Sequence, residues 1–339
     1  MRRTHLISLL LLTQFAFAQD GPYHVIKTAK VGGDGGFDYV YADSDGRRLY
    51  VARTGPNKRI DVFDLDSLQP VGKIPDVGAH GAAVDSRSHH GFATSKPVTM
   101  FDSLTLKTIK TIDVQGNPDG MLFDTFKRRV YILSHAAPNA TVIDAKTGDA
   151  VGTIDLGGAP EQAASDGKGN IYIDIEDKDN VAVVDAKTMK VTAHYDLGGS
   201  KTPAGLAFDA KNHVLFVECR NPAVSVVMDA RDGKILATLP IGTGVDGAGF
   251  LAATKEAFSS QGDGTLTVVK ETSPTSFNVE QTVKTMPSAK TMTIDEKTKH
   301  ILLIAAEFGP APAPEPGQQR PRRGPLVADS FTILVVGQD

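Results

Sequence analysis

The stretch Arg47-Arg48-Leu49-Tyr50-Val51-Ala52 decides the fold, because related stretches return along the whole chain. Each time, a polar pair runs into an apolar segment rich in β-branched and aromatic residues, which is typical of a buried strand. The further copies are at 128–133, 169–174, 213–218 and, more weakly, 299–304. A second strand follows each copy after a polar turn, and this recurrence predicts a repeat architecture.

The second strand of each repeat ends in an aspartate, at Asp64, Asp102, Asp144, Asp185 and Asp229. The intervals between them are 38, 42, 41 and 44 residues, the length of a four-stranded propeller blade. We expect these aspartates to form turns by accepting hydrogen bonds from nearby backbone N–H groups. The count predicts seven blades, at 32–78, 79–116, 117–158, 159–200, 201–244, 245–285 and from 286 onward.

The last blade is one strand short at the C-terminus, and the missing strand is predicted at the other end of the chain. Residues 23–32 have the pattern of a fourth strand and should pair with the C-terminal strand. Such pairing removes the exposed sheet edges of an open ring. The sequence therefore predicts an all-β, seven-bladed β-propeller, a single domain at 19–339, closed by an N-terminal strand that completes the last blade.

The first 18 residues have the pattern of a secretory signal peptide. A basic start is followed by an apolar stretch and by Ala16-Phe17-Ala18, a small-x-small cleavage site, so the mature chain is expected to begin at Gln19. No other segment is apolar enough to predict a membrane span, so a soluble protein in the periplasm or outside the cell is expected. We also expect a monomer. The lone Cys219 is expected to pack as a small apolar residue. The formal charge of −4 predicts no general affinity for nucleic acid.

The chain resembles the YVTN-repeat β-propellers, the YncE-like periplasmic proteins. The resemblance is carried by Leu49-Tyr50-Val51, by the periodic Asp-turn-strand pattern and by the Gly-Gly spacers. Ala52-Arg53 stands where the name motif has Thr-Asn, and Leu133-Ser134 stands there in blade 3. The resemblance implies a secreted propeller and no particular reaction, because such folds carry many functions.

Ionisable residues recur at one repeat position, just before each innermost strand, where the loops open on one face of the propeller. Around the ring this position holds Asp38, His80, Asp119, Glu161, Ala204, Asp246 and Lys290. Loops after the second strands add Arg53, Lys96, His135, Glu176, Arg220, Gln261 and Glu307 to the same face, with a looser alignment. Crowded carboxylates repel one another, so some should be protonated, paired or bound to a cation. A ring of solvated charges with no ligand is the alternative interpretation.

These residues predict a binding function at the mouth of the channel, for a small charged ligand, a metal or a protein partner. His80, Asp119 and Glu161 are the expected metal ligands, since imidazole with carboxylate suits Zn²⁺, Mn²⁺ or Fe²⁺. The alternative function is a metal-assisted lyase or lactone hydrolase, with His80 or a carboxylate of raised pKa as the base. A Pro-rich insert at 308–325 in blade 7 is expected to be a flexible loop, or else a lid or docking arm on the same face.

Overall fold

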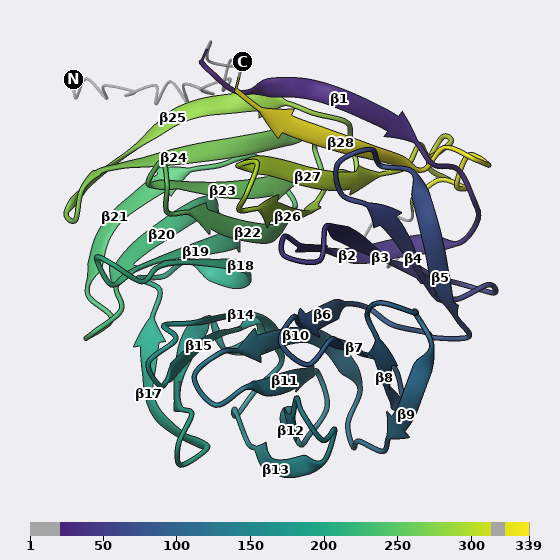
Figure 1. The fold of residues 1–339 in the computed structure, drawn as a ribbon. Coiled ribbons are helices and arrows are strands. Elements are labelled where there is room, and N and C mark those ends of the chain that lie inside the picture. The colour runs from purple at the N-terminus through teal and green to yellow at the C-terminus, as the bar shows by residue number, and fades with distance from the viewer. Residues whose placement is uncertain (1–20, 313–322, 339) are drawn as a thin grey trace, which may run out of the picture.

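The fold is known from a computed structural model, which describes residues 21–312 and 323–338. These residues form seven four-stranded sheets arranged around one axis (Figure 1). Within each sheet the neighbouring strands are antiparallel, and the innermost strands of adjacent blades contact one another around the axis. The predicted all-β, seven-bladed propeller is confirmed.

Blades 1 to 4 follow one another along the chain, with their strands in sequence order from the axis outward. Blade 1 contains β2 (Gly36–Asp43), β3 (Arg48–Thr54), β4 (Arg59–Asp64) and β5 (Pro70–Pro75). Blade 2 contains β6 (Ala82–Asp85), β7 (His90–Ala93), β8 (Val98–Asp102) and β9 (Thr108–Ile112). Blade 3 contains β10 (Pro118–Asp124), β11 (Arg129–Ser134), β12 (Ala140–Asp144) and β13 (Ala150–Ile154). Blade 4 contains β14 (Pro160–Ser165), β15 (Asn170–Ile175), β16 (Asn180–Asp185) and β17 (Lys190–Asp196), with the short 3-10 helix η1 (Glu176–Lys178) after β15.

Blades 5 to 7 continue the same order and complete the ring. Blade 5 contains β18 (Lys201–Asp209), β19 (Val214–Asn221), β20 (Ala223–Asp229) and β21 (Ile235–Pro240). Blade 6 contains β22 (Val245–Leu251), β23 (Glu256–Gln261), β24 (Thr265–Ser273) and β25 (Ser276–Lys284). Blade 7 contains β26 (Thr291–Asp295), β27 (His300–Ala305), β28 (Thr332–Gly337) and, from the other end of the chain, β1 (His24–Lys30).

The N-terminal strand closes the last blade, as the sequence predicts. Strand β1 pairs antiparallel with β28, from His24 opposite Gly337 to Lys30 opposite Thr332. Tyr23, just before β1, is 3% exposed and packs edge-to-face on Phe258 of blade 6 with ring centroids 5.1 Å apart. The same tyrosine donates its hydroxyl hydrogen bond to Glu256, so the closing strand is fixed to two blades.

The repeated aspartates form turns, as expected from the sequence. Asp144 Oδ1 accepts hydrogen bonds from the backbone N–H groups of Lys146 and Thr147, each over 2.9 Å. Asp185 Oδ1 likewise accepts hydrogen bonds from the backbone N–H groups of Lys187 and Thr188, over 2.7 and 2.9 Å. Each such turn satisfies backbone donors and directs the chain into the outermost strand of the blade.

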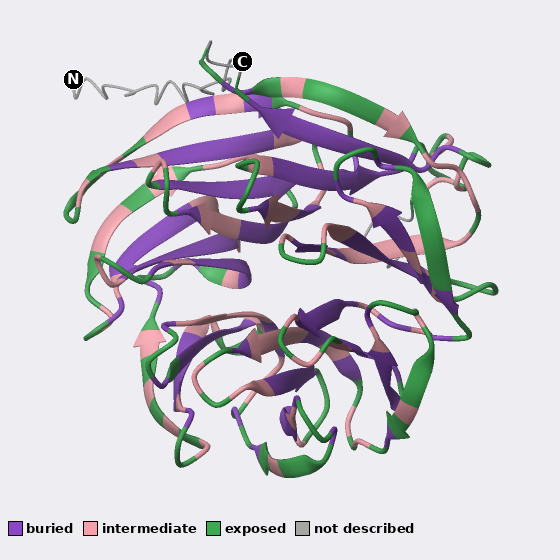
Figure 2. Ribbon diagram, in the orientation of Figure 1, coloured by how far each residue is buried: buried purple, intermediate pink, exposed green. Residues whose placement is uncertain are grey.

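The hydrophobic core lies between adjacent blades. The cluster between blades 1 and 2, for example, joins Tyr50 and Ile60 to Val84 and Phe101. Outer strands are largely exposed, as Figure 2 shows in green for β5 and much of β1, whereas the middle strands are buried. Stability therefore comes from packing of neighbouring blades, and Cys219, which is buried in the cluster between blades 4 and 5, forms no disulfide.

The ends of the Pro-rich insert are tied together at Phe308 and Leu326, which form an isolated antiparallel bridge. Residues 313–322 lie outside the described residues, and so does the predicted signal peptide at 1–18. Among the described residues, no helix has the length and apolar character needed to cross a membrane.

Candidate functional site

Bulges in the innermost strands place the predicted ring at the mouth of the channel. The pairing of β2, β10, β14, β18 and β22 with the next strand is irregular at one equivalent place. Asp38, Asp119, Glu161, Ala204 and Asp246 lie within these irregularities. A bulge bends its strand and redirects the side chain at that point. His80 and Lys290 occupy the loops just before β6 and β26.

One half of the mouth holds two histidines and three carboxylates. His80 Nδ1 lies 2.6 Å from Asp38 Oδ2 and 3.1 Å from Asp119 Oδ1. The other oxygen of Asp119 lies 3.0 Å from His135 Nε2, which is also 3.9 Å from Glu161 Oε2. Asp119 therefore bridges two imidazoles, one on each of its oxygens. We call Asp38, His80, Asp119, His135 and Glu161 the histidine–carboxylate group.

The other half of the mouth is a network of ion pairs centred on Arg220. Its guanidinium bonds Glu176 Oε1 through Nη1 over 2.7 Å, and Asp246 through Nη2. Its Nε donates to the carbonyl oxygen of Val245 over 2.9 Å. Lys290 pairs with the second oxygen of Asp246. Both cations of this half are therefore neutralised by carboxylates of the site itself.

Burial and crowding change the protonation of the mouth. Burial, together with the charges of Asp246 and Glu176, raises the pKa of Glu161 to about 9. Burial also raises the pKa of Asp119 above its ordinary value, against the opposing influence of His80. The hydrogen bond to Asp38 raises the pKa of His80. At neutral pH the Glu161 carboxyl is consequently protonated, and His80 keeps its proton to a higher pH than a free imidazole does.

The donor atoms of the histidine–carboxylate group are close enough to share metal ions. In two sets, one potential ligand atom per residue lies within 4.8 Å of the others: Asp38 with His80 and Asp119, and Asp119 with His135 and Glu161. The predicted ligands His80, Asp119 and Glu161 are therefore spread over two overlapping sets rather than forming one. Mixed imidazole and carboxylate donors fit a divalent transition metal in either set.

Arg53 does not join the mouth, although the sequence places it there. Its side chain is 1% exposed and lies over the Phe331 ring, with Cζ 3.5 Å from the ring centroid. Its Nη1 pairs with Asp61 over 3.3 Å, and its Nη2 donates to the carbonyl oxygen of Asp34 over 2.9 Å. In the strand register Arg53 is equivalent to Ser134 and not to His135, so it points between blades 1 and 7.

Other members of the looser second set also lack contacts with the histidine–carboxylate group. Lys96 Nζ donates to the carbonyl oxygen of Gly116 over 2.5 Å. Gln261 is fully buried and bonds Ser259, while Glu307 is exposed. Ala204 of the first ring is buried and offers no polar atom in its side chain. His135, Glu176 and Arg220 are therefore the members of the second set that reach the mouth.

Sequence reasoning missed three residues that support the mouth from below. Tyr39 donates from its hydroxyl to Glu161 Oε2 over 3.3 Å. The side chain of Gln162 accepts from the backbone of Leu206 over 2.9 Å and from that of Ala248 over 3.2 Å, which joins blade 4 to blades 5 and 6. Tyr39 and Gln162 follow Asp38 and Glu161 within the bulges, and this adjacency was their only signal in the sequence.

The third missed residue is Asp174, a fully buried carboxyl beneath Glu161. Its Oδ1 accepts from the backbone N–H of Gln162 over 2.5 Å, and Oδ2 has no hydrogen-bond partner among the residues that the structure describes. Burial raises the pKa of Asp174 to about 7. Below this level a cavity of about 430 Å³ continues along the channel, with Tyr39, Glu161 and Gln162 among its lining residues.

Comparison with known proteins identifies the fold and no more. No family model matches the chain, and no curated protein matches it. The structure matches 1607 chains of solved structures. One is a chain of the crystal structure of the mitotic checkpoint complex, with a TM-score of 0.74 and 10% sequence identity, covering 100% of this chain and 99% of that chain. At such low identity the likeness shows a β-propeller, a fold that hosts many functions.

Proposed function

We propose that this β-propeller binds a divalent transition-metal ion at the mouth of its channel, through the histidine–carboxylate group. The observation that carries the proposal is the position of Asp119, whose two oxygens lie 3.1 Å from His80 and 3.0 Å from His135. Neutral imidazoles and ionised carboxylates are the usual ligands of Zn²⁺, Mn²⁺ and Fe²⁺. A divalent cation would take the place of the protons that neutralise this crowded site.

The second half of the mouth contributes two cations to the site. Arg220 and Lys290 are held by Asp246 and Glu176, and Arg220 Nη1 lies 4.0 Å from Glu161 Oε1. The anionic part of a small charged ligand that reaches the metal would compete with these carboxylates for the two cations. The ligand class in this proposal is therefore a metal ion, alone or with a small charged molecule.

The test compares metal-dependent stabilisation of two double variants. A ligand that binds only the folded state raises stability in proportion to its occupancy. His80→Ala with Asp119→Asn should abolish the rise in melting temperature that Zn²⁺ or Mn²⁺ causes in the wild type. His89→Ala with Asp66→Asn, which changes the same residue types outside the mouth, should retain it. If no divalent metal shifts the melting temperature of the wild type, the metal proposal fails.

A metal-assisted lyase or lactone hydrolase is the second candidate, and Glu161 is the observation that favours it. Its side chain is 10% exposed, its pKa is raised to about 9, and Tyr39 donates to it. A carboxyl that stays protonated at neutral pH can serve as a general acid. For this candidate the metal would be held by Asp38, His80 and Asp119, the set that does not include Glu161. Hydrolysis of a lactone panel by the metal-loaded wild type, lost in Glu161→Gln while that metal stays bound, would favour this candidate over simple binding.

We extend the proposal to a secreted or periplasmic protein of the YVTN-repeat kind that acts as a monomer. The support is the leader pattern at 1–18 and the recurrence of the strand stretch around 47–52. Expression in a Gram-negative host, followed by fractionation and N-terminal sequencing, should give a periplasmic chain that begins at Gln19. Size-exclusion chromatography with light scattering should give the mass of one chain. In the same measurement, binding to a protein partner would show as a larger mass.

A further inference from the structure

Asp119 stands between two sets of potential ligand atoms that have the same composition. Its Oδ1 faces His80 in the set that also contains Asp38, and its Oδ2 faces His135 in the set that also contains Glu161. Each set thus holds one imidazole, one carboxylate of its own and one oxygen of Asp119. Blades 1 to 3 supply the first set, and blades 3 and 4 supply the second. Asp119 therefore has the position of a ligand that bridges two ions.

The spacing of these atoms suits an ion in each set. Two ligand atoms that each lie about 2.1 Å from one Zn²⁺ are separated by about 3.0 Å at a right angle and by about 3.4 Å at the tetrahedral angle. Asp119 lies 3.1 Å from His80 in the first set and 3.0 Å from His135 in the second. The other spacings are 2.6 Å, between His80 and Asp38, and 3.9 Å, between His135 and Glu161. Changes of about half an ångström would bring both into the range of a bound ion.

The carboxyl groups of the two sets outnumber the cations that reach them. In the part of the chain that the structure describes, no lysine or arginine forms an ion pair with Asp38 or Asp119, and Arg220 reaches Glu161 only at 4.0 Å. Both cations of the mouth are already held in the ion-pair network around Arg220. Asp174, buried beneath Glu161, is a fourth carboxyl group without an ion pair among the described residues. One divalent ion cannot balance three ionised carboxylates, whereas two divalent ions balance as many as four.

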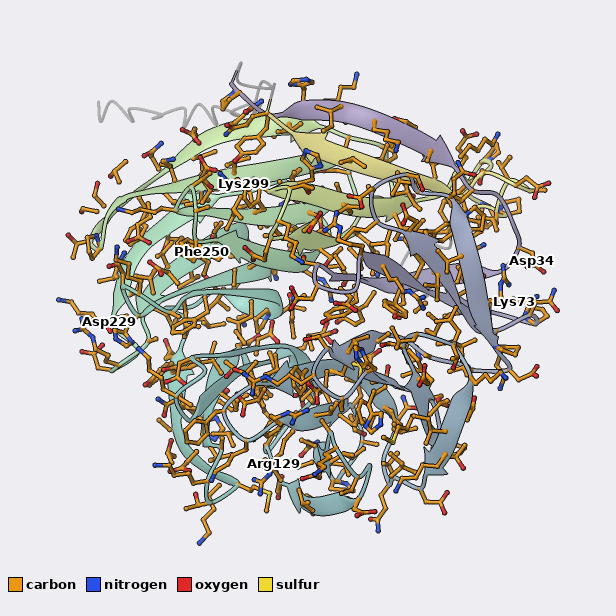
Figure 3. The ribbon with its side chains drawn as sticks, viewed as in Figure 1. Asp34, Lys73, Arg129, Asp229, Phe250 and Lys299 are labelled. Atoms are coloured by element: carbon orange, nitrogen blue, oxygen red, sulfur yellow. The ribbon has the colours of Figure 1, made fainter. Side chains whose placement is uncertain are left out.

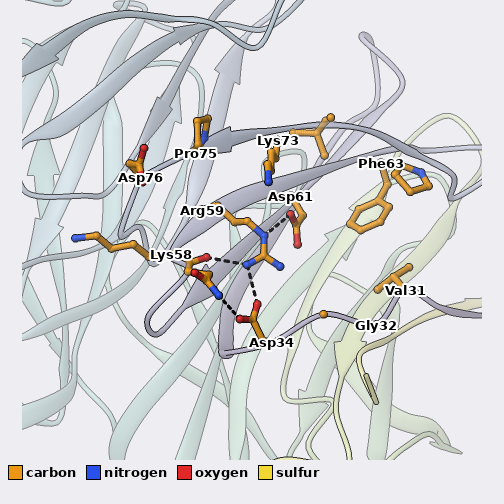
Figure 4. A pocket seen from close by; sticks show the side chains of 15 residues that line it. Val31, Gly32, Asp34, Lys58, Arg59, Asp61, Phe63, Lys73, Pro75 and Asp76 are labelled. Carbon is orange, nitrogen blue, oxygen red and sulfur yellow. Dashed lines mark hydrogen bonds and ion pairs between the residues drawn. The ribbon is translucent and has the colours of Figure 1, made fainter. Parts of the chain in front are cut away.

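A charged pocket at the rim of blade 1 shows the opposite balance. The pocket has a volume of about 520 Å³, and Asp34 and Lys73, which line it, lie at the outer edge of the molecule (Figure 3). Figure 4 shows Arg59 bonded both to Asp34 and to Asp61. The charged lining residues of the two signs are equal in number, namely Asp34, Asp61 and Asp76 against Lys58, Arg59 and Lys73. This pocket is balanced by its own side chains and has no histidine in its lining, so the excess of carboxylate at the mouth is a specific feature of that site.

We infer that the histidine–carboxylate group binds two divalent transition-metal ions, bridged by Asp119. One ion takes Asp38, His80 and one oxygen of Asp119. The other ion takes His135, Glu161 and the second oxygen of Asp119. Ions in two-metal sites of proteins are typically about 3.5–4 Å apart, close enough to share one carboxylate. The inference rests on the metal binding proposed above and adds a second ion to it, and Glu161 then serves as a ligand and not as an acid.

Counting the bound ions on the full chain tests the inference. Protein stripped with a chelator is dialysed against an excess of Zn²⁺ and then against metal-free buffer, and the zinc that stays bound is measured by mass spectrometry. The wild type should hold two ions per chain, whereas Asp38→Asn and Glu161→Gln, which each damage one set, should hold one. Glu307→Gln changes an exposed carboxylate outside both sets and should keep two. Circular dichroism and thermal melting show whether each variant is folded.

Loading with Mn²⁺ gives a measurement of the bridge itself. Two Mn²⁺ ions that share a carboxylate are coupled magnetically, so the electron paramagnetic resonance spectrum of the wild type should differ from that of an isolated ion. Asp38→Asn and Glu161→Gln should each give the spectrum of an isolated ion. A single bound ion in the wild type would overturn the second ion and leave the proposed metal binding intact, whereas no bound ion would overturn both. Two ions that show no coupling, or that both variants retain, would overturn the bridge at Asp119.

Discussion

Tyr39 of blade 1 donates a hydrogen bond from its phenolic oxygen to Oε2 of Glu161 in blade 4, over 3.3 Å. The two residues belong to blades that are not neighbours, so this contact joins separate parts of the ring at its centre. Burial is the main cause that raises the pKa of both groups, that of Glu161 to about 9 and that of Tyr39 well above its usual value. At neutral pH the pair is uncharged.

The hydroxyl of Tyr39 should contribute measurably to stability. Tyr39→Phe removes the donor to Glu161, and we expect a loss of about 1 kcal/mol in the free energy of unfolding. Tyr131→Phe is the matched control, because within the described part of the chain the buried Tyr131 hydroxyl has no hydrogen-bond partner, so its removal should be neutral or stabilising. Urea denaturation of both variants measures the difference. Equal stability of the two variants would contradict the contact.

The closing strand should be indispensable to the folded ring. Deletion of residues 19–31 removes β1 and leaves the edge of β28 unpaired in blade 7. Exposed edges promote association between molecules, so we expect insoluble or strongly destabilised protein. Calorimetry and sedimentation of the refolded material provide the measurement. A deletion variant that stays monomeric and melts with the full-length chain would show that β1 does not close the ring.

How far the mouth could be predicted from the sequence depends on the strand register. Asp38, Asp119, Glu161 and Asp246 occupy one position of the repeat, so counting residues from the turn aspartates was enough to group them. Arg53 aligns with Ser134 and Cys219 when the pairing is known, whereas His135 and Arg220 come one residue later. Successive side chains on a strand point to opposite faces, so a one-residue error moved Arg53 from between the blades to the mouth.

The remaining features depend on contacts that the repeat does not encode. Tyr39 and Gln162 enter the site because bulges add a second residue beside Asp38 and Glu161, and no period in the sequence signals a bulge. The position of Asp61 opposite Lys73 is likewise known only once the register of the β4–β5 hairpin is fixed. The sequence could show the ring of blades, but not which charges remain without a partner.

Cys219 should behave as a packed thiol and not as part of a site. It is fully buried in the cluster between blades 4 and 5, and burial is the largest cause that raises its pKa. Cys219→Ala should cost about 1 kcal/mol or somewhat more, measured by urea denaturation. The native protein should not react with a thiol reagent until it is unfolded. Loss of metal-dependent stabilisation in this variant, with unchanged stability, would instead place the residue in the site.

Glu218 should make the protein less stable as the pH rises. Burial raises its pKa in the folded state to about 8 from an ordinary value of 4.5, so the folded state keeps a proton that the unfolded state loses between these values. The free energy of unfolding therefore falls across that window, by on the order of 1.4 kcal/mol per pH unit. In Glu218→Gln this contribution disappears, so the fall between pH 5 and 8 should be shallower.

The decisive quantity for Glu218 is the slope of the free energy of unfolding against pH. The glutamine amide in Glu218→Gln also changes the free energy of unfolding at every pH, so its absolute value is not informative. Other buried acids, such as Asp174 with a pKa raised to about 7, add to the fall in both proteins and cancel in the comparison. The exposed Glu307→Gln controls for the loss of one carboxylate elsewhere. Chemical denaturation at several pH values should give parallel curves for this control and the wild type. A Glu218→Gln curve parallel to them would contradict the prediction.

The pairing of β1 with β28 also sets the order of events during synthesis. The first strand, β1, pairs with the last strand, β28, so blade 7 stays incomplete until almost the whole chain has left the ribosome. Contacts of such large separation along the chain form late, after loop closure has been achieved. Until then β1 has no partner strand, and a newly made chain carries an open sheet edge that invites association. We therefore expect yield to depend on protection of the N-terminal strand before closure, by a chaperone or by low chain concentration.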